Sequence, residues 1–103
     1  MIQLKLNNLL FLDLEINPTN QQIFKIGALL IQDFGQANMS QQEFEQDTRS
    51  KDTLTSALKV IMDMAKNADC LIGHNIIHHD MPILKSINSM LNIFHLPVID
   101  TLQ

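Results

Sequence analysis

The chain has 103 residues and a mass of 11.7 kDa, enough for one hydrophobic core and too little for two. Hydrophobic residues make up 46% and charged residues 17% of the sequence, a balance that indicates a packed domain and excludes a disordered one. The net charge is −4 and Arg49 is the only arginine, which argues against a protein that holds nucleic acid through a broad basic surface. A phosphate ligand would then need bound divalent metal in place of side-chain cations.

The cellular setting is inferred from the cysteine content and the amino terminus. The single cysteine, Cys70, cannot form an internal disulfide and is interpreted as a small core residue. The chain has no secretory signal, and its apolar runs fall far short of the roughly 20 residues of a membrane-crossing helix. The sequence therefore predicts a cytoplasmic protein with no membrane segment.

The first part of the chain is predicted to form a β-hairpin and a third strand. Residues Leu9–Ile16 are apolar at both sets of alternate positions, which is typical of a central strand. The turn Asn17–Asn20 follows, and Gln22–Gln32 resumes a strand rich in Ile, Leu and Phe. A weaker third strand is expected near Gln41–Gln46.

The remainder of the chain changes to helical spacing. Apolar residues at helical intervals predict a helix from Asp52 to Asn67, with Asp52 or Thr53 as its N-cap. Strands that pair first as a meander and then through helices predict an α/β fold with a mixed sheet. The later elements are expected to be a strand at Cys70–Gly73, a loop, a helix from Met81 to Leu91 and a strand at Val98 and Ile99.

Three carboxylates are candidates for a metal site. Asp13 and Glu15 lie two residues apart in the first strand, so their side chains point to the same face. Neighbouring carboxylates repel each other unless a cation lies between them, and Mg²⁺ or Mn²⁺ prefers such oxygens. Asp80 follows a strand expected to lie beside the first one, so all three are predicted to converge. The alternatives are a water-exposed strand end for Asp13 and Glu15, and a helix N-cap, with Pro82 in the first turn, for Asp80.

The segment Leu71–Leu84 also carries three histidines. His74 and His78 are four residues apart and precede His79 and Asp80, which superficially indicates a zinc site. That spacing binds metal best on a helix, whereas this segment follows a strand and contains β-branched residues. We therefore expect His74 to fix the loop by hydrogen bonding instead.

Several segments together resemble a known family. FLDLEI, IFKIGALLI, GHNIIHHDMPIL and VIDTL resemble, in this order, the first two motifs of the DEDD 3′–5′ exonucleases, the family of the bacterial DNA polymerase III proofreading subunit. The distance from the His-Asn pair to the aspartate is closer to that in the TREX-type and helicase-associated exonucleases. The resemblance implies a ribonuclease H-like fold, truncated before its last helices, with residues 1–103 forming a partial exonuclease domain.

The resemblance also implies a mechanism. Asp13 and Glu15 would be the metal ligands and catalytic residues of the first motif, and Asp80 the acid of the second. Two ions, Mg²⁺ or Mn²⁺, would hydrolyse phosphodiester bonds from the 3′ end of single-stranded DNA or RNA. One ion would generate hydroxide and the other would stabilise the leaving 3′ oxygen. Asp100 would match a structural aspartate.

Substrate contacts follow from the same resemblance, and so do the departures from it. Ile16, His74 and Asn75 would contact the substrate, although Ile16 and Asn17 stand where many members have threonine beside the first-motif glutamate. His79 occupies a place where the family usually has an aromatic residue. The third motif, a histidine followed by the fourth acid, would lie beyond Gln103.

These departures lead to the expectation that residues 1–103 are inactive alone. The alternatives are a non-catalytic ribonuclease H-like module that contacts protein or nucleic acid, and a metal-binding structural domain. The resemblance is compatible with a replication or repair protein that is fused to or associated with a helicase or polymerase. A sheet face left bare by missing helices would favour a homo-oligomer.

Overall fold

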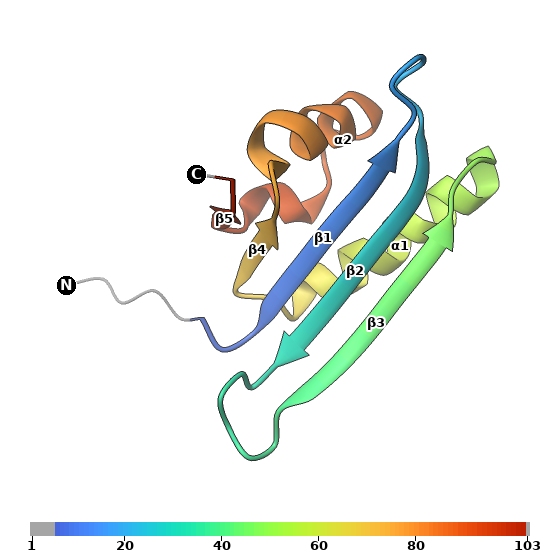
Figure 1. Cartoon of the computed structure of the whole chain (residues 1–103). Coiled ribbons are helices and arrows are strands. Elements are labelled where there is room, and N and C mark those ends of the chain that lie inside the picture. Colours follow the sequence, from blue (N-terminus) through green and yellow to red (C-terminus); the bar gives the residue numbers. More distant parts are fainter. Residues whose placement is uncertain (1–5, 103) are drawn as a thin grey trace.

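The computed structural model describes residues 6–102, and its centre is one five-stranded sheet (Figure 1). The strand order is β3-β2-β1-β4-β5. β1 is antiparallel to β2 and β2 to β3, whereas β4 runs parallel to β1 and β5 runs parallel to β4. The predicted α/β fold with a mixed sheet is therefore confirmed. The strands are β1 (Leu9–Ile16), β2 (Ile23–Gln32), β3 (Ser40–Asp47), β4 (Cys70–Gly73) and β5 (Val98–Asp100), each within one residue of its predicted bounds.

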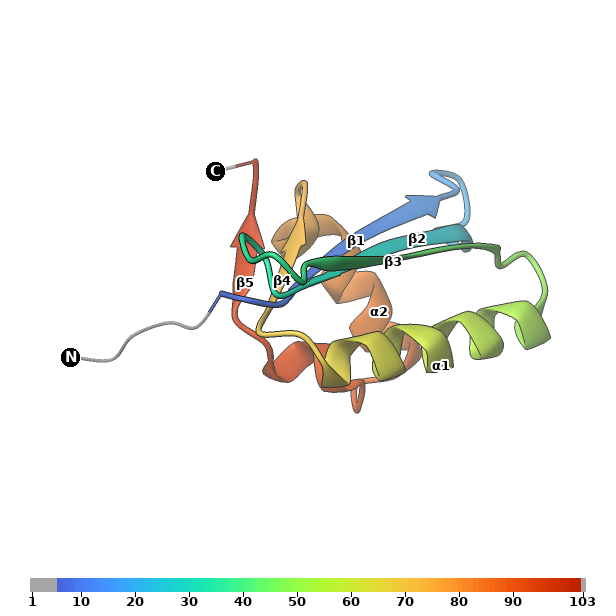
Figure 2. The same ribbon diagram turned by 90° about the horizontal axis from the view of Figure 1, so that it is seen from below.

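All helices lie on one face of the sheet (Figure 2). They are the α-helices α1 (Lys51–Lys66) and α2 (Met81–Ile87), the π-helix η1 (Ile76–Asp80) and the 3-10 helix η2 (Asn92–His95). No element of residues 6–102 covers the opposite face, which we call the open face. In this part of the chain, no helix is both long and apolar enough to cross a membrane.

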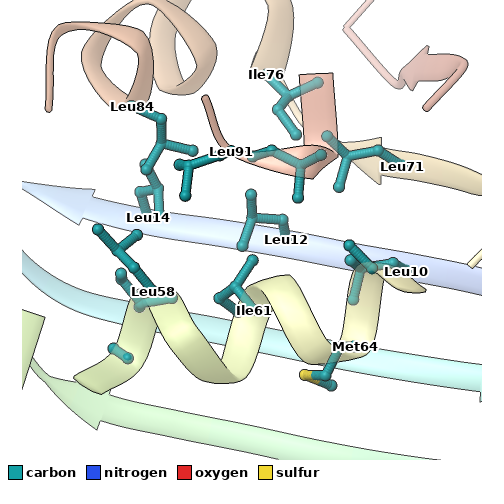
Figure 3. Close-up of a cluster of buried hydrophobic side chains, with 14 of the residues drawn as sticks. Leu10, Leu12, Leu14, Leu58, Ile61, Met64, Leu71, Ile76, Leu84 and Leu91 are labelled. Carbon is teal, nitrogen blue, oxygen red and sulfur yellow. The ribbon is translucent and has the colours of Figure 1, made fainter. Parts of the chain in front are cut away.

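The core lies between the sheet and α1, and alternation along β1 creates it (Figure 3). Leu10, Leu12 and Leu14 point toward the helices and are at most 5% exposed. Apolar residues at helical spacing on α1 pack against these leucines, and Leu91, in the segment after α2, completes the cluster. The other large side chains of this cluster that Figure 3 labels are Leu58, Ile61, Met64, Leu71, Ile76, Leu84 and Leu91.

The start of α1 differs slightly from its prediction. The N-cap is Ser50 and not Asp52 or Thr53: the Ser50 hydroxyl accepts a hydrogen bond from the Thr53 N–H at 3.1 Å. The Thr53 hydroxyl in turn accepts one from the Ser50 N–H at 3.3 Å. This reciprocal pair is a capping box with threonine in the place of the usual acid, so the helix begins at Lys51.

The region around the second helix differs more strongly. The segment predicted as a loop winds into the π-helix Ile76–Asp80, and the helix that follows ends at Ile87, so the prediction of a helix up to Leu91 was wrong. Asn88 has an extended backbone, and its side chain accepts a hydrogen bond from the Met90 N–H at 2.9 Å. This local bond competes with helical hydrogen bonding and stops the helix.

Gly73 allows the close approach of β4 to its neighbours. A Cβ atom at this position would lie 2.8 Å from Ile76 Cδ1 and 3.0 Å from the Leu12 carbonyl oxygen. Ile76 has no exposed surface and the Leu12 oxygen belongs to the central strand, so neither can move away easily.

Substituting Gly73→Ala should therefore lower the free energy of unfolding by about 1–3 kcal/mol, the usual cost of overpacking. Urea unfolding followed by circular dichroism measures this change. Gly27→Ala is the matched control, because a Cβ atom there would meet its nearest neighbour at an ordinary 3.8 Å. Equal stability of the two variants would contradict the proposed clash.

Candidate functional site

Asp13 and Glu15 share the open face of β1, as their spacing predicted. Both side chains are exposed, and they alternate with Leu12 and Leu14, which are buried in the core. The residue of β2 opposite Asp13 is Gly27, which has no side chain and leaves the space beside this carboxylate free. The two acids therefore form an open, water-accessible pair on the central strand.

A lysine that the sequence analysis missed lies beside this pair. Lys25 stands opposite Glu15 in the hairpin register, and its Nζ lies 2.9 Å from Glu45 Oε1. The hydrogen bond and charge of Glu45 raise the pKa of Lys25, with smaller contributions from the charges of Glu15 and Asp13. A single cation thus offsets part of the repulsion between the acids. The register of the hairpin is the signal that would have revealed it.

Asp80 is buried beside β1, with 3% of its surface exposed. Its Oδ1 lies 2.7 Å from His79 Nδ1, and the backbone N–H of Leu14 acts to lower its pKa. This edge of β1 is accessible because the pairing with β4 ends at Phe11. Asp80 occupies the N-cap position of α2, with Pro82 in the first turn as expected, but its side chain makes no capping hydrogen bond.

Burial raises the pKa of Asp80, and the negative charge of Asp13 contributes in the same direction. The hydrogen bond and charge of His79 and the Leu14 N–H act against this shift without cancelling it. The helix η1, which ends at Asp80, lies against β1, the strand that carries Asp13.

The loop after β4 is held by hydrogen bonds to the end of β5. His74 Nδ1 lies 3.2 Å from Thr101 Oγ1, which confirms that His74 fixes the loop by hydrogen bonding. Asn75 has a left-handed backbone with a φ of 56°, and its N–H donates to Asp100 Oδ1 at 2.9 Å. The Ile77 N–H donates to the other oxygen of Asp100 at 3.0 Å.

Asp100 is the anchor of this loop. A third backbone donor, the Leu102 N–H, reaches Asp100 Oδ1 at 2.9 Å. Backbone hydrogen bonds hold the pKa of Asp100 below its usual value. The largest effect comes from the N–H group of Leu102, followed by those of Ile77 and Asn75. Asp100 therefore fixes the start of the π-helix whose last residue is Asp80.

The structure brings only some of the predicted site residues together. Asp13 and Glu15 are adjacent and Asp80 is near Asp13, but in residues 6–102 no group of three or more His, Cys, Asp or Glu is arranged to hold a metal ion. Asp80 already has His79 as a hydrogen-bond partner. His78 is exposed, so the histidine segment forms no zinc cluster within the described range.

The predicted substrate contacts occupy different surroundings. Ile16 is half-buried and packs against the core, on the opposite side of β1 from Asp13 and Glu15. His74 lines a hollow of about 720 Å³ on the open face, together with Phe11 and Ile72. Asn75 contributes its backbone N–H to the Asp100 anchor.

The chemistry of the donors fits a hard divalent ion at Asp13 and Glu15, because both offer exposed carboxylate oxygens on one face. Asp80 would join such a site only after its bond to His79 is broken or turned aside. The pair on β1 is therefore the first place at which a metal would bind.

Comparisons with known proteins gave no match. Neither a scan against protein-family models, nor a search of curated proteins, nor a search of solved structures found a similar protein. The function is therefore inferred from the residues of this chain.

The raised pKa of Asp80 predicts a particular dependence of stability on pH. A group whose folded pKa lies above its unfolded value, ordinarily 3.8, contributes full stability below that value and loses it as the pH rises through the folded pKa. At pH 7 and in the presence of a chelator, Asp80→Asn should therefore raise the free energy of unfolding, by about 1 kcal/mol. The advantage should vanish near pH 3.

Denaturant unfolding at several pH values measures this difference. Asp63→Asn is the matched control, because within residues 6–102 this exposed aspartate on α1 pairs with Lys66 alone, and its removal should change stability by less than about 0.5 kcal/mol. A wild-type chain more stable than Asp80→Asn at pH 7 would contradict the direction of the pKa shift.

Proposed function

We propose that residues 1–103 are part of a DEDD-type 3′–5′ exonuclease domain with a ribonuclease H-like fold. The observation that carries the proposal is the placement of the acids. Asp13 and Glu15 stand side by side and exposed on the central strand, and the buried Asp80 lies at the same end of that strand, next to Leu14.

The topology supports this proposal. The hairpin strands lie on one side of β1 and the parallel strands on the other, in the order β3-β2-β1-β4-β5. The resemblance of the sequence to the exonucleases implies a mixed sheet of this kind, with the first-motif acids on its central strand. The π-helix that carries Asp80 supports it as well, since isolated π-turns are frequent at functional sites.

The chain's own groups have distinct tasks in this proposal. Asp13 and Glu15 would offer carboxylate oxygens to the metal, and Asp80, which is paired with His79 at 2.7 Å, would complete the set. Two divalent ions bound there would supply hydroxide and stabilise the leaving 3′ oxygen. Phe11 and Ile72 provide an apolar surface in the hollow beside the acids, against which the terminal base of a DNA or RNA strand can stack.

Residues 1–103 do not include the histidine and fourth acid of the family's third motif. We therefore expect this segment alone to bind Mn²⁺ weakly and to hydrolyse no substrate at a measurable rate. Hydrolysis requires a chain, or a pair of chains, that also carries the third motif.

The decisive experiment measures digestion of a 5′-labelled single strand by a chain that carries both this segment and the third motif. With Mg²⁺ or Mn²⁺, the products should shorten from the 3′ end, and Asp13→Ala should lower the rate at least about 100-fold, because the loss of a metal ligand removes several kcal/mol of transition-state stabilisation. Cutting that needs no metal, or that Asp13→Ala leaves unchanged, would contradict the mechanism.

Metal binding is tested separately on the 103-residue chain. Mn²⁺ should broaden the amide resonances of β1 around Asp13 and Glu15, and Asp13→Asn should abolish the broadening. Glu43→Gln is the matched control, since this exposed acid of β3 lies on the same face but outside the proposed metal site.

The second candidate is a non-catalytic ribonuclease H-like module that contacts protein or nucleic acid. The engagement of Asp80 by His79 at 2.7 Å favours it, because this bond keeps a carboxylate away from a metal. The Mn²⁺ titration separates the two candidates: a module without catalysis should show no broadening at Asp13 and Glu15.

We also propose that the open face of this segment mediates self-association when no nucleic acid strand occupies it. Its apolar centre consists of Phe11, Leu29, Ile31, Ile72 and Ile99, of which Ile99 is 39% exposed and the others half-buried. Exposed apolar surface of this kind usually finds a partner. A helicase or polymerase, to which the resemblance points, is an alternative partner for the same face.

Leu29→Lys should therefore shift the chain from dimer to monomer at high concentration, because it places a charge at the centre of this surface. Sedimentation equilibrium measures the change. Lys59→Glu on the exposed side of α1 serves as the control and should leave association unchanged. A wild-type chain that sediments as a single monomer would contradict the proposal.

A further inference from the structure

We propose that the outer edge of β3 binds an extended basic peptide as a sixth strand of the sheet. The peptide would carry lysine or arginine at alternate positions and apolar residues between them. This inference concerns a surface away from Asp13, Glu15 and Asp80, and it does not rest on the proposed nuclease function.

β3 is a long and regular edge strand (Figure 1). It pairs with β2 through eight consecutive residues, from Asp47 opposite Lys25 to Ser40 opposite Gln32, without a bulge. Natural edge strands usually carry charged residues, above all lysine, or proline or a bulge that prevents further pairing. The sequence SQQEFEQD contains no lysine, proline or bulge, and its charges are all carboxylates, so the edge is open to strand addition by a basic partner.

The register identifies the free backbone groups. The Thr48 N–H donates to the Phe24 carbonyl at 3.0 Å, so this pair is hydrogen-bonded across the ladder. Hydrogen-bonded pairs recur at every second residue of an antiparallel ladder, so the even-numbered residues of β3 bond to β2 and the odd-numbered ones face outward. The outward N–H and C=O groups belong to Gln41, Glu43, Glu45 and Asp47.

Most of these outward groups have no partner in the part of the chain that the structure describes. Only the Asp47 carbonyl is engaged, by the side-chain amide of Gln46 at 3.0 Å. The N–H and C=O groups of Gln41, Glu43 and Glu45 remain available, and a peptide strand could bond to all three residues.

The same strand presents carboxylates on the open face at the spacing of a paired strand. Glu43, Glu45 and Asp47 follow one another at every second position and are exposed. Glu45 is paired with Lys25 and Asp47 with Arg49, whereas Glu43 makes no ion pair within residues 6–102. A peptide on the outer edge would place its own alternate side chains directly opposite this row, where positive charge is favoured.

The helix-facing side of β3 determines the residues between the basic ones. Phe44 is half-buried and packs against the core, between the exposed Gln42 and the half-buried Gln46. A β-branched or apolar side chain of the peptide would extend this packing across the edge. The favoured sequence therefore alternates lysine or arginine with residues such as valine.

A second copy of the chain fits this edge poorly. Antiparallel pairing of two β3 strands through their outward groups must place odd-numbered residues opposite odd-numbered residues. Glu43 and Glu45 would then face carboxylates, or Gln41, of the other copy, and like charges directly opposite destabilise a pair of strands. The charge of the edge therefore selects a basic partner.

The test uses a fluorescently labelled peptide that alternates lysine and valine, with fluorescence anisotropy as the readout. The control peptide has the same composition, with its lysines consecutive and its valines consecutive. The alternating peptide should bind at least about tenfold more tightly, and added salt should weaken its binding. Equal binding of both peptides would overturn the proposal, since it would indicate attraction by charge alone.

Two variants separate the backbone contribution from that of charge. Glu43→Pro removes an outward N–H and leaves the ladder to β2 intact, as proline is tolerated at such edge positions. It should weaken binding of the alternating peptide at least about tenfold, whereas Glu43→Gln should weaken it only about two- to fivefold. Asp63→Asn, a charge change on α1, should have no effect. Binding to Glu43→Pro equal to that of Glu43→Gln would overturn strand addition.

If Glu43→Pro fails to fold, amide hydrogen exchange of the wild-type chain tests strand addition instead. In the wild-type chain, the alternating peptide should slow exchange of the outward amides of Gln41, Glu43 and Glu45. Unchanged exchange at these amides would overturn the proposal. So would their protection in a dimer that forms without peptide, which would assign the edge to a second copy.

Discussion

The alternation of side chains along β1 is the constraint on which the rest of the structure depends. One row, Leu10, Leu12 and Leu14, is buried against the helices, and this burial fixes the orientation of the whole strand. The other row then has to face the open side, which carries Asp13 and Glu15 to the surface together. A shift of one residue in register would bury both acids, so the hydrophobic core and the proposed metal site are consequences of the same pattern.

Asp80 is placed by a different part of the fold. The backbone donors that converge on Asp100 hold the turn after β4, and the π-helix begins directly from that turn. The short β4 leaves the far half of β1 unpaired on this side, where the Leu14 N–H acts on the pKa of Asp80. The position of Asp80 therefore depends on the turn after β4 and on the short length of that strand.

The sequence predicted most of the fold because strands and helices are determined largely by periodicity. The alternation in Leu9–Ile16 corresponds to the strand β1, and the helical spacing from Leu54 onward corresponds to the helix α1. The sequence did not predict the π-helix or the end of α2, since these depend on Gly73, Asp100 and the side chain of Asn88, which act locally or across long separations. The same holds within the site: the exposure of Asp13 and Glu15 follows from alternation, whereas the bond between His79 and Asp80 requires the completed turn.

The amino-terminal end of β1 is joined to the turn before β4 by Asp69, which accepts hydrogen bonds from the backbone N–H groups of Asn7 and Asn8. Asn8 and Asp69 are 61 positions apart in the sequence, so their hydrogen bond closes a large loop of the chain. Contacts between such distant residues form slowly during folding. The β1-β2-β3 meander, by contrast, needs only neighbouring segments. During folding, the meander can therefore form before β4 pairs with β1, whereas the segment that carries Asp80 reaches β1 only after this large loop has closed.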